Sequence, residues 1–452
     1  MTDQPRDGAR VARDARVAQV GRVAIVGGGW AGLAAAVEAT QRGRHVTLFE
    51  MAAQLGGRAR AVPAVSSVPA VPAVPAADLL LDNGQHILIG AYSATLALMR
   101  TVGVVQEQAF LRTPLRIGYP DGSGLLLQAG APIPQFALAV LRLRAWPLLD
   151  RLALLWAATR WTLAGFKCDP HWSVARLTAG LPDTVRRDLI DPLCVAALNT
   201  PAQAASATVF LRVLKDALFT GAGSADLLLP RGDLSQLLPG PAGRWLAGAG
   251  ATLRLGHRVQ TIEARSSAWH VDGEAFDHVV LAATATEAAR LVQALAPDWA
   301  RTARAMRYEP IVTVYLRCAG ARLPEAMLAL RSDAESPAQF VFDRGQLGGP
   351  PGLLAFVVSG AAEWVAQGKQ AVLAATVRQA RAALGTHLNG PLEAVQVLIE
   401  KRATFACTPA LERPPAHIAE GLHAAGDYVA GPYPATLEGA VRSGVAAACA
   451  AG

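Results

Sequence analysis

Three glycines near the N-terminus have the spacing of a phosphate-binding turn. Gly27, Gly29 and Gly32 form the pattern G-x-G-x-x-G directly after the apolar run Val23–Val26. In such a pattern the first glycine permits a tight turn, the second lets the backbone approach a pyrophosphate, and the third lets a helix pack closely on a strand. The free N–H groups at the start of that helix attract phosphates. The pattern predicts a dinucleotide-binding site.

An acidic residue stands where such a site binds a ribose. Glu50 follows a second apolar run, His45–Phe49, so the whole unit has the order strand, helix, strand, acid. A carboxylate at this place accepts hydrogen bonds from ribose hydroxyls and repels a 2′-phosphate. FAD or NAD is therefore favoured over NADP. The alternative, that the glycines only shape turns, leaves the complete strand–helix–strand unit and its acid unexplained.

A second glycine turn follows the acid and decides between these dinucleotides. Residues 46–50 followed by Gly56, Gly57 and Arg58 resemble the signature of the amine oxidase and phytoene desaturase superfamily. In that superfamily the Gly-Gly-Arg turn passes along the FAD pyrophosphate, and the arginine supports bound phosphate or the flavin region. An NAD dehydrogenase has no need of this turn. The resemblance therefore implies FAD as the cofactor.

The C-terminus carries a third part of the same signature. Gly426 and Asp427 resemble the superfamily motif that holds the pyrophosphate and ribityl portion of FAD. Thr436 can cap a helix whose first amides, beginning at Leu437, would face the N1–C2=O edge of the flavin. The positive end of that helix would stabilise an anionic reduced flavin. The FAD contacts that we predict are Gly27, Gly29, Gly32, Glu50, Gly57, Arg58, Val259, Gly426, Asp427, Thr436 and Leu437.

Within the superfamily the chain is most similar to the hydroxysqualene dehydroxylases, formerly described as squalene-associated FAD-dependent desaturases. The similarity spans nearly the whole sequence, and a repeated Val-Pro-Ala insertion at residues 61–77 is its main departure. The segments that carry it are residues 82–90, 198–201, 205–207, 227–230, 401–405 and 433–444.

The resemblance implies a reaction of squalene and hopanoid biosynthesis. An allylic hydroxyl of the isoprenoid hydroxysqualene is replaced by hydrogen, which gives squalene. A partner must supply electrons to the flavin, and the protein must supply a proton to the departing water. A positioned acid contributes about 10² to 10⁴ in rate. His86 and Tyr433 are the catalytic candidates, although a structural hydrogen bond is the more typical role for a residue such as His86; Lys215, beside Asp216, is more typical of an ion-paired helix residue.

Two other functions fit parts of the same pattern. A carotenoid or phytoene-type desaturase shares the FAD motifs and a lipophilic substrate but uses the flavin as an oxidant. A non-catalytic prenyl-lipid-binding protein shares the fold, although Glu50, Arg58 and Asp427 are all retained here. An amine oxidase is disfavoured because the expected lysine and aromatic cage cannot be placed.

These motifs require an α/β fold in which two domains interleave, since 452 residues exceed one hydrophobic core. We expect a two-dinucleotide-binding, Rossmann-like flavoprotein fold with a substrate domain of mixed sheet and helices. Residues 92–237 are mostly helical by periodicity, and strands return at 251–281, 311–316 and 353–358. The predicted divisions are a disordered leader at 1–21, FAD-binding parts at 22–91, 238–300 and 421–452, and substrate-domain parts at 92–237 and 301–420.

Composition excludes several other classes. The net charge of +7 comes from scattered arginines without a nucleic-acid-binding motif, so no nucleic-acid partner is expected. Five widely separated cysteines give neither metal-ligand spacing nor a disulfide framework, so we expect no metal and a reducing cytoplasm. No stretch is apolar enough to span a membrane. Residues 136–161, rich in leucine, tryptophan and arginine, predict a helix pair, part of which could contact the inner face of the cytoplasmic membrane.

Overall fold

The computed structural model describes residues 21–64, 79–265 and 268–451. The predicted leader at 1–21, apart from Gly21, and most of the Val-Pro-Ala insertion lie outside the described residues. The described start of the insertion is not loop alone, because β3 (Ala61–Pro63) pairs with β4 (Leu80–Asp82) in a two-stranded ribbon. The prolines exclude a central strand but not this short ribbon.

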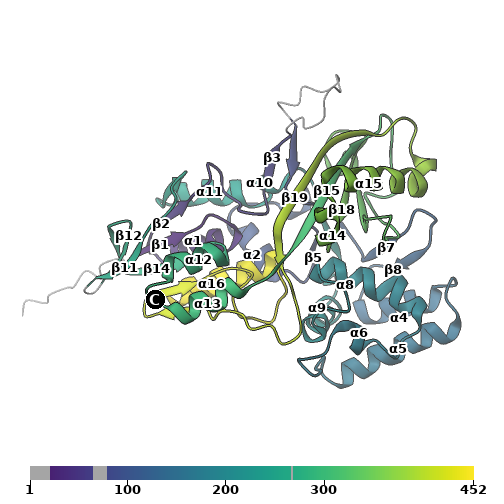
Figure 1. The fold of residues 1–452 in the computed structure, drawn as a ribbon, viewed down its shortest axis with the longest axis horizontal. Coiled ribbons are helices and arrows are strands. Elements are labelled where there is room, and N and C mark those ends of the chain that lie inside the picture. Colours follow the sequence, from purple (N-terminus) through teal and green to yellow (C-terminus); the bar gives the residue numbers. More distant parts are fainter. Residues whose placement is uncertain (1–20, 65–78, 266–267, 452) are drawn as a thin grey trace, which may run out of the picture.

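The sheet that carries the glycine turn gathers strands from distant parts of the sequence. Its order is β10-β2-β1-β14-β21-β20, with all neighbours parallel except the last pair. Parallel strands are covered on both faces, which explains their continuous apolar runs. The strands are β1 (Arg22–Val26), β2 (His45–Glu50), β10 (Thr252–Leu255), β14 (His278–Leu281), β20 (His417–Ala419) and β21 (Leu422–Ala424). The C-terminal segment therefore returns beside the N-terminal unit, as predicted (Figure 1).

Helices cover this sheet, and the tightest contact joins the first helix to the last. At Gly444 a Cβ would lie 2.1 Å from the carbonyl oxygen of Ala31, so only glycine permits this approach. A small antiparallel sheet lies beside the same domain, made of β11 (Ile262–Arg265), β12 (Ala268–Val271) and β13 (Glu274–Phe276). The helices are α1 (Trp30–Gln41), α11 (Pro239–Gly248), α12 (Ala285–Val292), α13 (Pro297–Ala305) and α16 (Leu437–Ala450).

A second large sheet is antiparallel and has the order β16-β17-β18-β15-β19. Its strands are β15 (Tyr308–Arg317), β16 (Met327–Ala329), β17 (Phe340–Asp343), β18 (Leu353–Val358) and β19 (Glu393–Phe405), and α14 (Ala362–Gln367) and α15 (Lys369–Leu384) accompany them. The predicted strands at 311–316 and 353–358 are thus confirmed. The 3₁₀ turns are Arg344–Leu347 and Gly385–His387.

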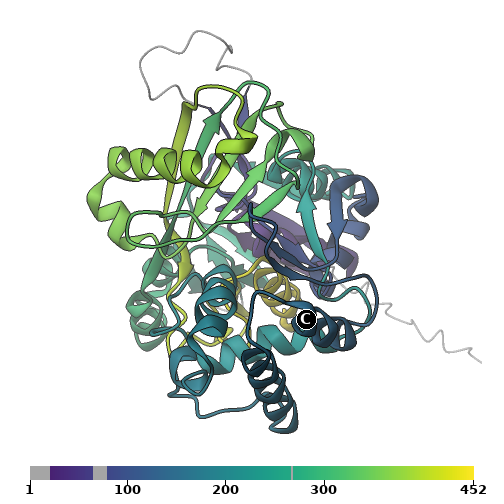
Figure 2. The same cartoon turned by 90° about the vertical axis from the view of Figure 1, so that its right-hand side faces the viewer.

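The middle of the chain forms a helical region on one side of the molecule (Figures 1 and 2). The helices of this region are α4 (Pro132–Arg142), α5 (Leu148–Leu163), α6 (Val174–Leu177), α7 (Asp183–Val185), α8 (Asp191–Leu198) and α9 (Ala207–Phe219), with a π turn at Arg186–Ile190. Of the other helices in this stretch, α2 (Ser93–Thr101) packs on α16, α10 (Leu234–Leu237) packs on α11, and α3 (Gln106–Ala109) lies between α2 and β6. The helical prediction is confirmed. It missed the short strands β6 (Phe110–Thr113), β7 (Arg116–Gly118), β8 (Gly124–Leu126) and β9 (Leu227–Pro230); β5 (Leu88–Ile89) precedes this range and pairs with β9.

The predicted helix pair within 136–161 is confirmed as α4 and α5. Trp146, in the connection between them, is only 6% exposed and belongs to the core. Within the described ranges, no helix is both long and apolar enough to cross a membrane. The same ranges contain no group of three His, Cys, Asp or Glu side chains arranged to hold a metal ion.

Candidate FAD site

The first glycine turn joins β1 to α1 through backbone conformations that side chains would obstruct. Gly27 has φ +115°, and a Cβ there would lie 2.5 Å from the carbonyl oxygen of Ala282. A Cβ at Gly32 would lie 1.8 Å from the carbonyl oxygen of Gly27. At Gly29 the nearest atom to such a Cβ is 3.8 Å away, so this part of the turn is open. The turn thus has two sterically closed glycines and one at which a ligand has room.

Glu50 is buried at the end of β2 and faces the same turn. One carboxylate oxygen accepts a 2.7 Å hydrogen bond from the amide of Gly28, and the other accepts a 2.8 Å bond from the amide of Ala52. These bonds fix the carboxylate beside the turn. The remaining lone pairs of its oxygens are those that we assign to a ribose.

The Gly-Gly-Arg turn packs directly on the first glycine turn. The amide of Gly56 donates a 2.9 Å bond to the carbonyl of Gly28, and a bridge pairs Gly29 with Gly56. Gly57 has φ +60°, and a Cβ on it would lie 3.1 Å from Cα of Gly29. Two backbone segments without side chains therefore meet where the sequence predicts a pyrophosphate.

Arg58 reaches from this turn to the C-terminal motif. Its Nη2 donates to Oδ1 of Asp427 at 2.6 Å, and its Nη1 donates to the carbonyl of Ala403 at 2.8 Å. Burial alone lowers the pKa of Arg58, but the carboxylate of Asp427 raises it above its ordinary value. The guanidinium therefore remains charged beside the proposed cofactor site.

The C-terminal motif presents a glycine, an acid and a helix start in sequence. The amide of Gly426 donates to Oγ of Ser443 at 3.1 Å, and Asp427 is only 7% exposed. Thr436 caps α16 by accepting a 3.1 Å bond from the amide of Gly439, so the predicted cap is confirmed. Leu437 is the first residue of that helix. The free amides of this turn provide the positive helix end that we assign to the flavin edge.

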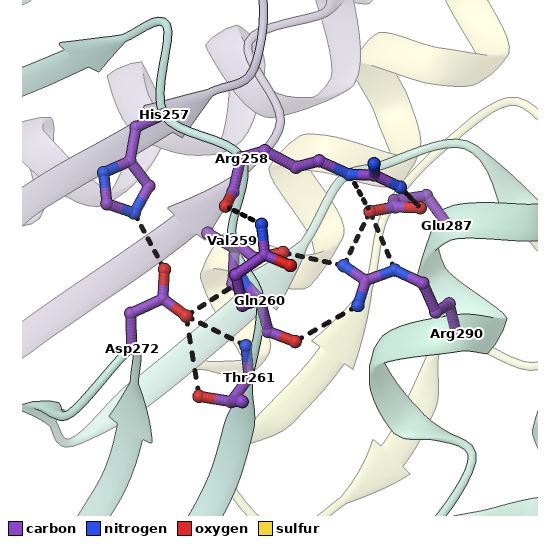
Figure 3. A network of polar contacts seen from close by, with 8 residues as sticks. All are labelled: His257, Arg258, Val259, Gln260, Thr261, Asp272, Glu287 and Arg290. Carbon is purple, nitrogen blue, oxygen red and sulfur yellow. Dashed lines mark hydrogen bonds and ion pairs between the residues drawn. The ribbon is translucent and has the colours of Figure 1, made fainter.

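Val259 lies in a loop that a network of polar contacts holds in place (Figure 3). The amide of His257 donates to the carbonyl of Glu50 at 2.9 Å. Asp272 accepts bonds from the loop amides of residues 260 and 261, both at 2.9 Å, and Arg290 donates to the carbonyl of Val259 at 2.7 Å. Within the described ranges the amide of Val259 donates no hydrogen bond of its own. The loop thus offers a free donor near the predicted ribose ligand.

One organising residue has no signal in the sequence. Arg413 donates from its three guanidinium nitrogens to the carbonyls of residues 427, 428, 429, 431 and 433, including a 2.5 Å bond to Asp427 and a 2.8 Å bond to Tyr433. Its guanidinium also stacks on Phe405 at 4.5 Å. A single arginine therefore shapes the segment between Asp427 and α16.

The described residues fit a bound FAD. The two glycine turns meet with open space at Gly29, and within the described ranges the amide of Val259 is free. The hydroxyl of Tyr428 is buried near Asp427 and Arg58 and has no partner within the described ranges. Such an orphaned donor is costly unless a ligand pairs with it.

The parallel sheet, its glycine turn and the C-terminal helix start define an FAD-dependent oxidoreductase. The chain belongs to the family of flavin containing amine oxidoreductases, whose model matches residues 30–451. The predicted superfamily, FAD cofactor and fold class are thereby confirmed.

Comparison with individual proteins shows which members of this family the chain resembles. The chain is 27% identical to proteins named hydroxysqualene dehydroxylase from Sinorhizobium fredii and Rhodopseudomonas palustris, over 94% of this chain and 97% of each relative. The predicted resemblance to that group is confirmed. Among solved structures, an oxidoreductase from Methanosarcina mazei has a TM-score of 0.68 at 15% identity, covering 94% of this chain and 99% of that one. Cyclohexylamine oxidase from Brevibacterium oxydans has a TM-score of 0.63 at 18% identity, covering 96% and 99%.

The two catalytic candidates lie in different hydrogen-bond networks. Nδ1 of His86 lies 2.9 Å from the carbonyl of Gly84, so Nδ1 carries the proton and donates. Burial lowers the pKa of His86, and the charge of Arg58 lowers it further. The neutral ring therefore has a lone pair on Nε2. His86 is thus placed near the FAD site as a hydrogen-bond acceptor.

Tyr433 is held between two arginines. Arg212 donates to its hydroxyl at 3.0 Å, and the guanidinium carbons of Arg212 and Arg442 lie 4.9 and 5.4 Å from the ring centre. Burial raises the pKa of Tyr433. Because its oxygen accepts from Arg212, its own proton is free to donate. The side chain lines a cavity of about 430 Å³.

Lys215 does not make the ion pair expected of it. Asp216 instead pairs with Arg212, one helical turn earlier, at 2.9 Å. Lys215 is exposed on α9 and forms no salt bridge within the described residues. The spacing i, i+4 places Arg212 over Asp216, whereas an adjacent residue points elsewhere on the helix.

A buried network beneath the His86 segment was also missed. Asp82 accepts a 2.7 Å bond from the amide of Leu234 and lies 3.7 Å from Arg344, which itself donates to Gln85 at 3.0 Å. Burial raises the pKa of Asp82 to about 6, although the charge of Arg344 opposes the rise. Tyr315 donates to the carbonyl of Asp82 at 2.9 Å. The network fixes the turn from which His86 projects.

Proposed function

We propose that this protein reduces hydroxysqualene to squalene, in the cytoplasm, as a step of squalene and hopanoid biosynthesis. The observation that carries the proposal is the similarity over 94% of the chain to relatives named for this activity. Its support extends beyond the cofactor, because segments such as 82–90 and 198–201 resemble that family outside the glycine turns.

The reaction balances with one substrate and one reduced cofactor. Hydroxysqualene, the anionic reduced cofactor FADH⁻ and one proton give squalene, water and FAD; a carbon–oxygen bond breaks and a carbon–hydrogen bond forms. Reduced FAD supplies the hydride when bound. The oxygen leaves as water only when a proton reaches it, because hydroxide is a poor leaving group. A separate electron donor must then reduce the flavin again.

The chain's own residues hold the cofactor in this proposal. Gly27, Gly29 and Gly57 give the pyrophosphate a surface of backbone amides, while Glu50 and the loop of Val259 take the adenosine end. Arg58 and Asp427 lie toward the flavin end. Thr436 fixes the start of α16, and that positive end favours an anionic reduced flavin.

From their hydrogen-bond partners we propose different roles for the two catalytic candidates. His86 accepts the substrate hydroxyl at Nε2 and orients it, because its neutral ring has no proton at that nitrogen. Tyr433 donates the proton to the departing oxygen. The phenolate that remains would be stabilised by Arg212 and Arg442, both positively charged and beside the ring. A lipophilic isoprenoid is the other partner that this scheme requires.

Product analysis tests the proposal. Anaerobic incubation of the FAD-loaded protein with hydroxysqualene and a chemical flavin reductant is expected to give squalene by mass spectrometry. Oxidised flavin with phytoene is the matched reaction for a desaturase. Desaturated phytoene without squalene would contradict the proposed activity. A protein that cannot be loaded with FAD would instead be consistent with a non-catalytic prenyl-lipid-binding protein.

A further inference from the structure

Helices α4 and α5 expose an unusual number of large apolar side chains. On α5, Leu149 is 78% exposed, Trp156 64% and Leu163 80%. Leu148 and Leu152 on α5 and Ile133 and Leu141 on α4 are also exposed. Residues 149, 152, 156 and 163 follow spacings of three, four and seven, which places them on one side of a helix. They form a continuous stripe rather than scattered exceptions.

The other side of α5 already packs against the protein. Leu154 is buried, and Leu155, Ala157 and Trp161 are partly buried against the core. A helix on a globular surface normally turns its second side to water with polar residues. In α5 both sides carry large apolar residues, and the outer stripe does not pack against the described part of the protein. Figures 1 and 2 show that α5 lies at the edge of the molecule.

The segment that carries this stripe is also rich in positive charge. Between residues 132 and 168 the chain has the basic residues Arg142, Arg144, Arg151, Arg160 and Lys167, and Asp150 as its acid. Arg151 donates to the carbonyl of Leu141 at 2.8 Å and so ties the helices together. Arg142, Arg144, Arg160 and Lys167 make no salt bridge within the described residues. Their charges are free for an external anion.

We propose that this α4–α5 surface, made of the exposed apolar residues of α4 and α5 and the four unpaired basic residues, binds the interface of an anionic phospholipid bilayer. Leucine and tryptophan side chains enter the boundary between headgroups and acyl chains, while arginine and lysine pair with lipid phosphates. A second copy of the chain is a poorer occupant. A two-fold contact would place the same positive charges against each other.

The inference concerns binding and does not depend on the reaction proposed above. Vesicle binding requires no substrate and no turnover, so either proposal can fail alone. If both hold, the surface also explains how a substrate dissolved in lipid meets the enzyme.

Vesicle flotation of the FAD-loaded protein tests the surface. Wild type is expected to float with vesicles of phosphatidylglycerol and phosphatidylcholine, and weakly with phosphatidylcholine alone. The double variant Leu149→Glu, Trp156→Glu is expected to bind at least about tenfold more weakly. Leu295→Glu, at a position 39% exposed beyond α12, is the matched control and should bind like wild type. Trp146 is unsuitable for this test because it is buried.

The charges are tested separately. Arg142→Gln with Arg160→Gln should weaken binding to anionic vesicles, and Arg304→Gln on α13 should not. Salt of about 0.5 M should also reduce wild-type binding, since it screens charges beyond a few ångströms. Flavin absorbance and thermal unfolding show that each variant remains folded.

Three results would overturn the proposal. Wild type could fail to bind anionic vesicles. The Leu149 and Trp156 double variant could bind as tightly as the Leu295 control. Sedimentation could show that wild type is a dimer and that the same double variant is a monomer with unchanged vesicle binding. The surface would then bind a second copy of the chain.

Discussion

Arg58 and Asp427 are 369 residues apart in sequence and form an ion pair with an N–O distance of 2.6 Å. Asp427 is nearly buried, whereas the side chain of Arg58 is one-third exposed. The pair joins the second glycine turn to the C-terminal motif. Because the flanking residues of both lie in the predicted FAD site, we expect cofactor binding to depend on this pair.

Arg58→Ala is expected to weaken FAD binding by at least about tenfold, because it leaves the buried carboxylate of Asp427 without its cation. Flavin fluorescence titration of the apoprotein measures the effect. Asp427→Asn and the double variant complete a cycle, in which the double variant should lose less FAD binding free energy than the sum of the two single losses. Unchanged FAD affinity in Arg58→Ala would show that Arg58 does not contribute to FAD binding.

Gly29 and Gly32 should respond differently to the same added methyl group. In Gly29→Ala the Cβ has space and φ is an ordinary −74°, so stability should be kept while FAD affinity falls at least about tenfold. In Gly32→Ala the Cβ would meet the carbonyl of Gly27, and unfolding free energy should fall by about 3 kcal/mol or more. Thermal unfolding of the apoproteins separates the two. Equal losses of stability would contradict the assigned roles.

Local patterns predicted the parts of the site that depend on local geometry. The glycine spacing with Glu50 predicted β1, α1 and β2, since turns and buried strands leave a short-range signal. The residues that hold the backbone of the site in place could not be predicted from local patterns. Arg413 bonds to carbonyls that only the folded chain brings within reach, and the loop of Val259 depends on Asp272 across a strand pair. Periodicity also gave no guide to Trp146, because this residue lies in the connection between α4 and α5, where no helical repeat distinguishes a buried side from an exposed one.

Arg413→Gln should disorder the segment before α16 without unfolding the sheet. A partly buried guanidinium that satisfies several carbonyls is lost, and each carbonyl left buried and unpaired costs about 1–3 kcal/mol before relaxation. We expect lower flavin content and faster limited proteolysis between residues 427 and 436. Arg304→Gln, an exposed change on α13, is the control. A variant with normal flavin content and protease resistance would show that the segment holds its shape by other contacts.

Stability should decrease in mild acid because of histidines at the edge of the parallel sheet. His417 and His423 face each other on β20 and β21 with ring centres 5.5 Å apart. Burial lowers the pKa of His423, as do the charges of His417 and His278, whereas Glu420 opposes them. The folded pKa is below the unfolded value of about 6.5. The unfolded chain therefore binds more protons, and stability present above that pH is lost as pH falls.

His423→Gln should flatten this dependence, because a glutamine takes no proton. Thermal unfolding from about pH 8 to pH 5 gives the slope, and His387→Gln in a distant 3₁₀ turn is the control. An unchanged slope in His423→Gln would assign the acid sensitivity to other groups.

The pH dependence of turnover distinguishes His86 from Tyr433 as the acid. An acid at His86 must be protonated, and burial and Arg58 hold its pKa below the ordinary value of about 6.5. Turnover would then fall as pH rises through the acidic range. An acid at Tyr433 has a raised pKa, so turnover should remain level from neutral to about pH 9. We expect the level profile, with kcat lowered about 10² to 10⁴ in Tyr433→Phe and mainly KM raised in His86→Gln. FAD content must stay normal in both variants. If turnover falls as pH rises from about 5 to 7, and this fall is absent in His86→Gln, His86 and not Tyr433 is the acid.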